Sequence, residues 1–507
     1  MNEKRICSAL ISVFYKEGLD EIVRLLNELK VKIYSTGGTF NFIKDLGIPA
    51  LKVEDLTTYP SILGGRVKTL HPSVFGGILA RRENKEDMDQ VAKYKIPEID
   101  LVIVDLYPFE DTVRNVNDEE EIIEKIDIGG ISLIRAAAKN FNDVLVVSGR
   151  DQYPNLLNLL KEKKGVTSLP DRKFYAAEAF KTSSGYDTAI FKYFNREAGI
   201  PVFRESINIS YPLRYGENPH QKGIFFGDPD QLFDKLHGRE ISYNNLLDIE
   251  SALNLIDEFS RTSCVIVKHN NACGAASRDN IKEAWEAALA CDPVSAYGGV
   301  IVTNAEIDET TASEIDRIFF EIIIAPDFNG KALEILKQKK NRIILKRKMP
   351  VNNVYCFRSL LNGVLWQERD SSIESGKEMK PVTARIPEPA ETDDLVFANI
   401  IVKHSKSNAI VLAKNKQLCA SGIGQTSRVD ALKQAIDKAR LFGFDLNGSV
   451  MASDAFFPFP DCVEIAHKAG VRAVVQPGGS VRDQESIDYC SSNGIAMVFT
   501  GIRHFKH

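Results

Sequence analysis

Short apolar runs that alternate with helical patterns constrain the fold of this chain more than any other feature. Between residues 6 and 150 the runs "ICSALISV", "VKIYST", "LVIVDLYPF" and "VLVVSG" alternate with helix-like segments such as "GLDEIVRLLNEL". Buried strands that alternate with helices predict a parallel sheet covered by helices on both faces. Ligands of such sheets bind at the carboxyl ends of the strands, so we expect the chemistry in the loops there.

The chain length and a passage rich in turn-forming residues indicate how the sequence divides into domains. The 507 residues exceed what one hydrophobic core normally holds. A helical stretch from about 170 to 198 leads into the passage "GIPVFRESINISYPLRYGENPHQ", which is rich in proline, asparagine and glycine. We therefore expect one α/β domain over residues 1–200 and another over residues 201–507.

A strand–helix pattern occurs twice in the second domain. The segments "SCVIVKH", "NIKEAWEAALA" and "GGVIVTN" have counterparts in "NAIVLAK", "VDALKQAIDKA" and "SVMASDAFF". We expect two related α/β subdomains, about 201–370 and 371–507.

Composition excludes several classes of protein. The formal charge of −5 indicates no excess of basic residues that would favour nucleic-acid binding. No apolar run approaches the roughly twenty residues needed to cross a membrane. The eight cysteines include no C-x-x-C pair, so we expect reduced thiols in a cytoplasmic protein.

Two glycine-containing loops of the first domain are suited to anions. "STGGT", from Ser35 to Thr39, follows a predicted strand and precedes a helix, where free N–H groups attract a phosphate. An ordinary strand-to-helix turn is the alternative. "GGRVKTLHP" adds Arg66, Lys68 and Thr69, which are donors for a phosphate or a ribose unless the loop is simply solvated.

Two further loops add groups that can move protons. "DLYPF" places Tyr107 at the end of a buried strand. "IDIGGISLIRAAAKN" places Asp127 before a Gly-Gly turn and Lys139 about three helical turns later. A lysine on such a helix is usually solvated, and only these neighbours favour a functional role for Lys139.

The stretch "VIVKHNNACGAAS" sets Lys268 and His269 at the end of a buried strand. A histidine there is by default a packing or surface residue, but the carboxyl end of a strand favours function. Successive residues of a strand point to opposite faces, so both can serve one substrate only if the chain turns here. The asparagines and Gly274 suit such a turn.

Many of these segments together resemble a known enzyme family. They are "GGRVKTLHP", "LYPF", "IDIGG", "PLRYGENPHQ", "YNNLLD", "KHNNACG", "CDPVSAYGG", "GIGQTSR", "QPGGS" and "GIRHFKH". The chain resembles the bifunctional phosphoribosylaminoimidazolecarboxamide (AICAR) formyltransferase/IMP cyclohydrolases of purine biosynthesis. The resemblance covers nearly the whole chain.

The resemblance implies a fold and two reactions. The first domain would be a methylglyoxal-synthase-like cyclohydrolase, and the second a formyltransferase built from two cytidine-deaminase-like subdomains. The formyl group of 10-formyltetrahydrofolate, a cosubstrate, would pass to AICAR and give formyl-AICAR (FAICAR). FAICAR would then close to IMP with loss of water. The family also implies a homodimer with the formyltransferase site at the subunit interface.

The resemblance also implies residue roles. His269 would be the base that takes the proton of the AICAR amine, beside Lys268 and Asn408. The AICAR ligands would be Arg214, Tyr215, Gly298, Glu321, Arg428, Phe456 and Arg503, and the folate ligands Asp461 and Ser480. Cyclisation would use Lys68, Tyr107, Asp127 and Lys139. The substrate contacts of cyclisation would be Ser12, Lys16, Ser35, Thr36, Gly37, Gly38, Thr39, Arg66, Val67, Thr69, Ile128 and Gly129.

Two other functions are compatible with parts of the sequence. A deaminase-like fold suggests a zinc hydrolase, which requires H-x-E and P-C-x-x-C. Neither motif occurs, and Cys273 and Cys291 lack partners at ligand spacing, so we expect no metal. Alternatively, the first domain could sense nucleotides without catalysis. Ring closure by the isolated domain would distinguish an enzyme from a sensor.

Overall fold

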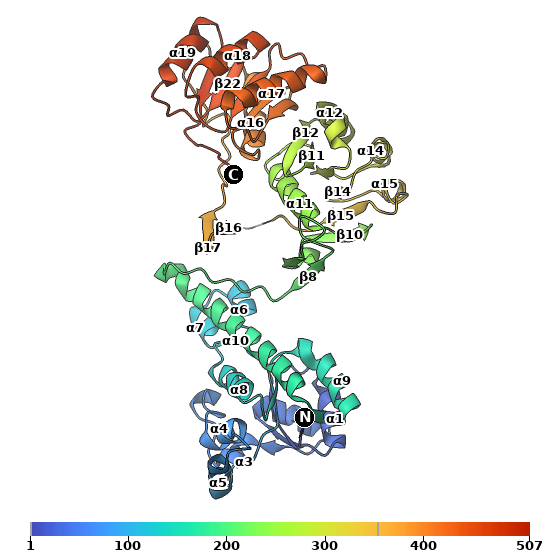
Figure 1. Cartoon of the computed structure of the whole chain (residues 1–507), viewed down its shortest axis with the longest axis vertical. Helices are drawn as coiled ribbons and strands as arrows, with labels where there is room; N and C mark the ends of the chain where they lie inside the picture. The colour runs from blue at the N-terminus through green and yellow to red at the C-terminus, as the bar shows by residue number, and fades with distance from the viewer. Residues whose placement is uncertain (1–2, 352–353) are drawn as a thin grey trace. The chain divides into compact units, whose positions relative to one another are not determined.

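A computed structural model describes residues 3–351 and 354–507 of the chain. The chain divides into two compact units, Met1–Asn208 and Ile209–His507 (Figure 1). No helix of the described residues is long and apolar enough to cross a membrane.

Unit 1 is built on a parallel sheet of five strands within the described residues, in the order β4-β3-β2-β5-β6. These strands are β2 (Ser8–Ser12), β3 (Lys32–Ser35), β4 (Leu51–Lys52), β5 (Leu101–Val104) and β6 (Leu145–Val147). Ala9 and Ile11 of β2 pack with α1 (Leu19–Glu28) and α9 (Tyr153–Lys163), whereas Leu10 packs with α4 (Pro72–Leu79) and α8 (Ile128–Lys139). Helices therefore cover both faces, as the alternating pattern predicts.

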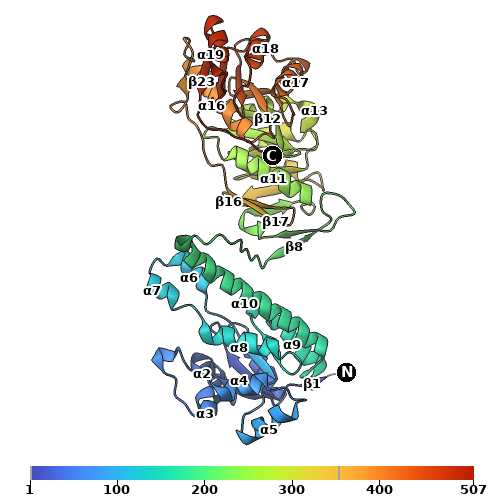
Figure 2. The same cartoon turned by 60° about the vertical axis from the view of Figure 1, so that its left-hand side comes forward.

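The remaining elements of unit 1 complete these layers. The long helix α10 (Leu169–Ala198) runs alongside α8 (Figure 2). It begins with a capping box at Ser168, in which the serine hydroxyl and the Asp171 carboxylate satisfy each other's backbone N–H groups. The others are β1 (Lys4–Arg5), α2 (Gly37–Asp45), α3 (Val53–Thr57), η1 (Leu63–Gly65), α5 (Lys85–Lys93), α6 (Phe109–Asn115), α7 (Glu119–Ile123), η2 (Arg150–Gln152) and β7 (Val166–Thr167).

Unit 2 is built on one mixed sheet, which has twelve strands within the described residues. Their order is β10-β15-β14-β13-β11-β12-β20-β19-β21-β22-β23-β18. The strands are β10 (Phe233–His237), β11 (Ser263–Lys268), β12 (Asn271–Ser277), β13 (Val300–Thr303), β14 (Ile322–Ala325), β15 (Ile343–Arg347), β18 (Lys380–Pro381), β19 (Ile410–Lys414), β20 (Gln417–Gly422), β21 (Val450–Ser453), β22 (Ala473–Gln476) and β23 (Ala496–Phe499).

Helices cover both faces of this sheet. One face packs against α11 (Tyr243–Ile256) and α16 (Pro389–Lys403). The other packs against α12 (Ile281–Cys291), α14 (Glu309–Ile315), α15 (Gly330–Leu336), α17 (Arg428–Leu441) and α18 (Asp461–Ala469). Further elements are the hairpins β8 (Ser210–Leu213)–β9 (Gly223–Phe226) and β16 (Tyr355–Leu360)–β17 (Gly363–Glu368), with η3 (Pro229–Gln231), α13 (Pro293–Ala296) and α19 (Asp483–Ser492).

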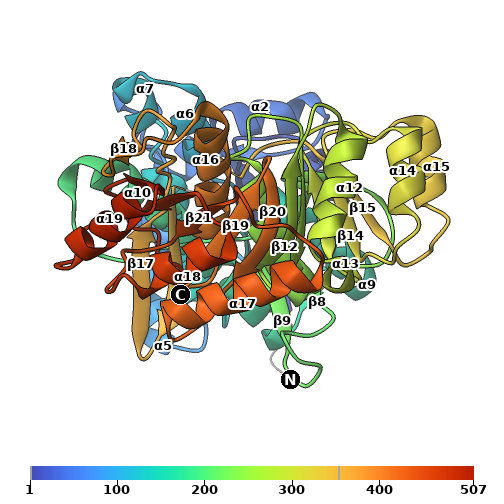
Figure 3. The same cartoon turned by 90° about the horizontal axis from the view of Figure 1, so that it is seen from above.

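The expected internal repeat is present in unit 2. Apart from the short helix α13, the order α11-β11-β12-α12-β13-α14-β14 recurs as α16-β19-β20-α17-β21-α18-β22. The two copies join through β12 and β20, which are neighbours near the middle of the sheet (Figure 3). This confirms the α/β class with a parallel first sheet and two related subdomains.

Candidate functional site

The turn after β3 in unit 1 presents the start of a helix to open space. The Ser35 hydroxyl donates to the Ile11 carbonyl at 2.7 Å, and the Thr39 hydroxyl donates to the Val13 carbonyl at 2.9 Å. Ser12 and Thr36 join their hydroxyls at 2.8 Å. A Cβ on Gly37 or Gly38 would meet no atom within 4 Å. Hydroxyl hydrogen bonds thus hold the turn, and open space lies beside its two glycines, which suits a phosphate at the start of α2.

Lys16 lies next to this turn, in the loop after β2. Its ammonium donates to the Phe14 carbonyl at 2.9 Å and also to the Val13 carbonyl. Burial lowers the pKa of Lys16, and the positive charge of Lys68 acts in the same direction. The charge of Lys68 is thus within electrostatic range of Lys16. Asp105, which the sequence did not single out, holds this loop by accepting the N–H of Tyr15 at 3.1 Å.

Asp127 and Tyr107 form the second part of this site. Asp127 caps α8 by accepting the Gly130 N–H at 2.6 Å. Burial raises the pKa of the Asp127 carboxyl, whereas the Gly130 N–H and the charge of Lys68 lower it. Burial raises the pKa of Tyr107, and the negative charge of Asp127 raises it further. The phenol stays protonated at neutral pH and can donate a hydrogen bond beside the carboxylate.

The loop with Lys68 lies against the start of α8. The Thr69 side chain is buried, and its hydroxyl would be 3.1 Å from a Cβ placed on Gly129. Val67 pairs with Ile62 in an isolated antiparallel β-bridge. Arg66 forms an exposed ion pair with Glu124, and Ile128 is exposed at the beginning of α8. Thr69, Ile128 and Gly129 thus lie together at the start of α8, whereas Lys139 lies at its other end.

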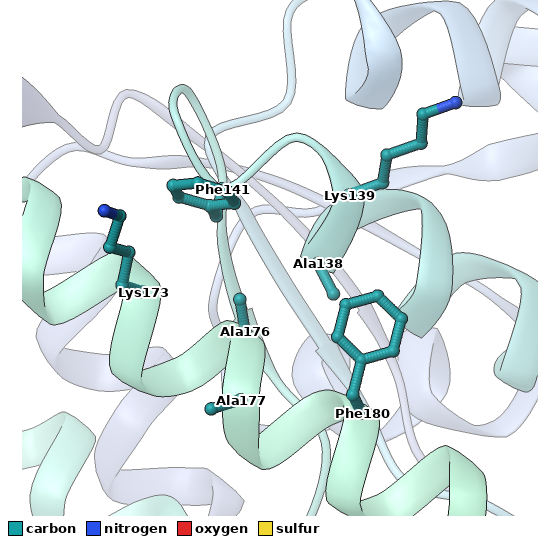
Figure 4. A pocket seen from close by; sticks show the side chains of 7 residues that line it. All are labelled: Ala138, Lys139, Phe141, Lys173, Ala176, Ala177 and Phe180. Atoms are coloured by element: carbon teal, nitrogen blue, oxygen red, sulfur yellow. The ribbon is translucent and has the colours of Figure 1, made fainter.

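Lys139 lies at the opposite end of α8 from Asp127. It is the last residue of the helix, and a rise of about 1.5 Å per residue places it roughly 18 Å from Asp127 along the axis. It borders an open depression of about 430 Å³ between α8 and α10, lined also by Phe141 and Phe180. The amine extends away from both rings (Figure 4). Within one chain the structure does not bring Lys139 to Asp127.

Ten of the predicted formyltransferase residues lie along one edge of the sheet in unit 2. We call it the His269 edge, the edge at which β11 ends and β12 begins. Strand register brings the starts of β13, β14 and β19 and the ends of β20, β21, β22 and β23 to this edge. Loops here carry Lys268, His269, Gly298, Glu321, Asn408, Arg428, Phe456, Asp461, Ser480 and Arg503.

The chain turns at His269 as expected. His269 and Asn270 have φ values of 53° and 64°, which reverse the strand between Lys268 and Asn271. Lys268 donates to the Tyr297 carbonyl at 2.7 Å, and Gly298 follows with a φ of 75°. Gly274 has a different role from the one expected. It lies within β12, where a Cβ would come within 2.2 Å of the Ala288 carbonyl of α12.

Asn408 and Arg428 form a second group at the His269 edge. Arg428 donates to the Asn408 side-chain oxygen at 2.9 Å, to the buried Asp454 carboxylate at 2.7 Å and to the Phe456 carbonyl at 3.2 Å. The Lys406 N–H donates to the Asn271 side chain at 3.2 Å, which connects this group to the His269 turn. The sequence did not single out Asp454, which fixes the guanidinium.

The outer positions of this edge are more exposed. In "DAFFPFPD" Phe457 is fully buried, whereas Phe456 and Phe459 are 37% and 48% exposed and can contact a planar ligand. Asp461 starts α18, and the Ser480 N–H donates to Asp483 at 3.0 Å. Arg503 lies over the Phe505 ring, 4.4 Å from its centroid.

The first half of unit 2 contributes two further predicted ligands, Arg214 and Tyr215, besides Glu321. Glu321 accepts from Asn245 at 2.8 Å and pairs with Arg239 at 2.9 Å. Arg214 lies over the ring of Tyr215, with 5.1 Å to the centroid. Both belong to the loop between β8 and β9, which the Asn244 side chain ties to the start of α11 through the Glu217 carbonyl at 3.2 Å.

The predicted ligands spread too widely for one small molecule. Six strand spacings of about 4.8 Å separate β14 from β21, which places Glu321 roughly 29 Å from Phe456, another predicted AICAR ligand, along the edge. The three spacings between β11 and β19 place His269 about 14 Å from Asn408. One chain therefore offers two neighbouring groups at this edge.

The cysteines are arranged for packing. Burial raises the pKa of Cys273 and of Cys291 to about 12, so both remain protonated thiols. Their Sγ atoms donate to the Ile266 and Ala287 carbonyls at 3.4 and 3.3 Å. No group of three or more His, Cys, Asp or Glu side chains that could hold a metal occurs in residues 3–351 and 354–507.

Comparison with known proteins identifies the relatives of this chain. Residues 137–438 match a family described as "AICARFT/IMPCHase bienzyme", and residues 18–132 match the MGS-like domain. A "Bifunctional purine biosynthesis protein PurH" of Bacteroides thetaiotaomicron is 64% identical over 504 residues, which are 99% of each chain. Proteins of the same name from Acetivibrio thermocellus and Aquifex aeolicus are 47% and 45% identical. They cover 98% of this chain and 99% and 100% of their own lengths.

Proposed function

Because the chain belongs to the AICARFT/IMPCHase bienzyme family of purine biosynthesis, we propose which of its residues perform each of the two reactions. The enzyme transfers a formyl group from a folate-type donor to AICAR and closes the product to IMP. We assign ring closure to unit 1 and formyl transfer to unit 2, with 10-formyltetrahydrofolate as the cosubstrate and no metal in the chemistry.

Formyl transfer requires a base and a stabilised oxyanion. The aromatic amine of AICAR is a poor nucleophile, because the ring and the carboxamide withdraw its electrons. His269 takes the amine proton as the N–C bond forms, and Lys268 and Asn408 stabilise the developing oxyanion. The observation that carries this assignment is the turn at His269, which places an exposed imidazole at the edge that also holds Asn408 and Arg428.

Substrate binding follows from the charges at the His269 edge. Arg428 and Arg503, with Arg214 from the β8–β9 loop, provide guanidinium groups for the AICAR phosphate. Tyr215, Gly298, Glu321 and Phe456 line the AICAR pocket, and Asp461 and Ser480 contact the folate.

Ring closure is intramolecular, so unit 1 mainly selects the reactive rotamer and manages charge. The carboxamide nitrogen of FAICAR attacks the formyl carbon, and water leaves. Lys68 and the protonated Tyr107 stabilise the formyl oxygen, while Asp127 exchanges protons with the amide and the departing water. The phosphate binds at Lys16 and the "STGGT" turn. The grouping of Lys68, Tyr107 and Asp127 supports an enzyme rather than a nucleotide sensor.

The functional molecule is a homodimer in this proposal. Lys139 lies about 18 Å from Asp127 of its own chain, so it can act in ring closure only from a second copy. The wide spread of ligands along the His269 edge supports a formyltransferase site completed by a partner in the same way. The eight free thiols and a biosynthetic role fit the cytoplasm.

One assay tests whether the protein performs both proposed reactions. The purified protein is given AICAR and 10-formyltetrahydrofolate, and tetrahydrofolate and IMP are followed together. We expect both products without added metal and after treatment with a chelator. Tetrahydrofolate without IMP would leave formyl transfer in place and favour the sensor interpretation of unit 1. A loss of activity that zinc restores would overturn the metal-free mechanism.

A further inference from the structure

An aspartate on a core helix holds the turn that presents His269. We propose that Asp248 of α11 is a positioning residue for formyl transfer, which fixes the His269–Asn270 backbone so that the imidazole faces the AICAR amine. The inference deepens the proposed function, because it rests on His269 as the base. Asp248 itself touches no substrate in this proposal.

The backbone conformation of the His269–Asn270 turn must be stabilised by contacts from other elements. His269 and Asn270 are consecutive non-glycine residues in the left-handed region, with φ of 53° and 64°. L-residues keep this conformation only where neighbouring groups enforce it, and such strain gathers at functional sites. Support from a rigid element would hold the imidazole in one place.

The first turns of α11 provide this support from two residues. Asp248 accepts the Asn270 N–H at 2.7 Å, and Ser251 donates to the Asn270 carbonyl at 2.8 Å. Both polar groups of the Asn270 backbone are thus tied to one helix. That helix is anchored in the core through the buried Ile249 and Leu253.

The carboxylate of Asp248 faces the turn. Burial raises the pKa of Asp248, whereas the N–H groups of Asn270 and His269 lower it. Asn271 closes the other side by donating to the His269 carbonyl at 2.8 Å.

The second half of unit 2 contains an equivalent turn, which is also held by an aspartate of a helix but has no histidine. Asp394 of α16 accepts the N–H groups of Asn415 and Lys416 at 2.7 and 2.6 Å. These turn residues have φ of 54° and 52°. Lys414 donates to the Asn447 carbonyl at 2.6 Å, as Lys268 does to the Tyr297 carbonyl at 2.7 Å. Asp248 and Asp394 are therefore equivalent, and so are His269 and Asn415.

The two turns lie at opposite edges of the sheet. β12 and β20 are antiparallel, with Ala276 opposite Gln417, so the Asn415–Lys416 turn is near the end of β12 and away from the His269 edge. The Arg278 side chain donates to the Asn415 carbonyl at 2.8 Å, which confirms this location. Asp394 thus performs the same backbone task at a turn with no predicted catalytic residue, and it serves as an internal control.

The test compares Asp248→Ala with Asp394→Ala in the full chain. We expect both variants to lower the melting temperature, but only Asp248→Ala to lower kcat of formyl transfer. A displacement of about 1 Å in a catalytic group can cost about 100-fold, so we expect a loss of roughly 10- to 100-fold, with KM for AICAR little changed. Asp248→Asn keeps one acceptor oxygen and should retain more activity than Asp248→Ala.

A third comparison asks whether Asp248 acts through His269. Adding Asp248→Ala to His269→Ala should cause no further loss of kcat, because residues that act as a unit are non-additive. Ser251→Ala removes the other tie and should lower kcat with a smaller change in melting temperature, which covers the case in which Asp248→Ala does not fold.

Three results would overturn the inference. They are equal kcat losses in Asp248→Ala and Asp394→Ala, a full additional loss in the double variant, and an unchanged kcat in Ser251→Ala if Asp248→Ala is unfolded. If His269→Ala alone retains formyl transfer, the proposed base itself is wrong, which is a separate result.

Discussion

At the scale of residues, the proposed site of unit 1 assigns different partners to the nucleotide phosphate and to the reacting groups. Lys16 and the first turn of α2 lie together around Thr39, whereas Tyr107 and Asp127 lie at the start of α8. Binding and chemistry should therefore respond to different substitutions.

Lys16→Ala should weaken the binding of IMP more than it slows ring closure at saturating FAICAR. Losing a charged donor to a phosphate costs roughly 1.5–3 kcal/mol, so Kd for IMP should rise about tenfold or more. Calorimetric titration with IMP measures this. Lys44→Ala, in the last turn of the same helix α2, is the matched control and should leave Kd unchanged. Equal effects of both variants would argue against a phosphate site at the start of α2.

At the scale of elements, a buried ionic cluster ties the C-terminal segment to the chain that joins the two halves of unit 2. The His504 ring nitrogens contact Asp370 at 2.7 Å and Glu374 at 2.9 Å, and the ring is 2% exposed. Burial alone would lower the pKa of His504, but the hydrogen bonds to the two carboxylates raise it to about 9. The same segment donates from the Lys506 N–H to the Ser407 hydroxyl at 3.0 Å, next to Asn408.

The stability of unit 2 should therefore fall at alkaline pH. The pKa of His504 is higher in the folded chain than in the unfolded chain, near 6.5. Its contribution is complete below about pH 6.5 and is lost as the pH rises through about 9. Melting temperatures measured from pH 7 to 10 should fall, and His504→Gln should flatten this part of the curve. His507→Gln, at the exposed terminus, is the control. An equal slope in His504→Gln and the parent would contradict this origin.

Much of the fold could be predicted from element patterns, but several contacts could not. Alternating apolar runs predicted the parallel sheet of unit 1 and the repeat in unit 2, because β-branched runs mark buried strands. The strands β12 and β20 were missed, since "NACGAAS" and "QLCASG" contain no β-branched residue.

The sequence likewise predicted some features of the candidate sites but not others. Local motifs predicted the turn at His269, because asparagines next to a strand end favour left-handed backbone. Asp105, Asp248 and Asp454 were not singled out, because a single aspartate gives no sequence signal for the loop or side chain that it will hold. The three helical turns between Asp127 and Lys139 already imply that the two residues lie far apart in one chain. In the proposed dimer, Asp127 of one chain would instead meet the partner's Lys139.

At the scale of the whole molecule, the dimer proposal predicts complementation between defective chains. Asp127→Asn and Lys139→Ala should each be inactive in ring closure. A mixed dimer restores one site, which combines Asp127 of one chain with the partner's Lys139. An equal mixture refolded together should recover about a quarter of the wild-type activity, because half of the dimers are mixed and each has one intact site of two. No recovery would show that both residues serve the same chain's site, and full activity of Lys139→Ala alone would show that Lys139 takes no part.

Ring closure and formyl transfer are proposed to use two separable active sites, with His269 as the base of formyl transfer in unit 2. The most direct test measures both half-reactions of His269→Ala, namely tetrahydrofolate release from AICAR and IMP formation from supplied FAICAR. Loss of a general base costs typically 100- to 10,000-fold, so we predict formyl transfer lower by about that factor and ring closure at the wild-type rate. Formyl transfer near the wild-type rate, or equal loss of both activities in a folded protein, would contradict the claim.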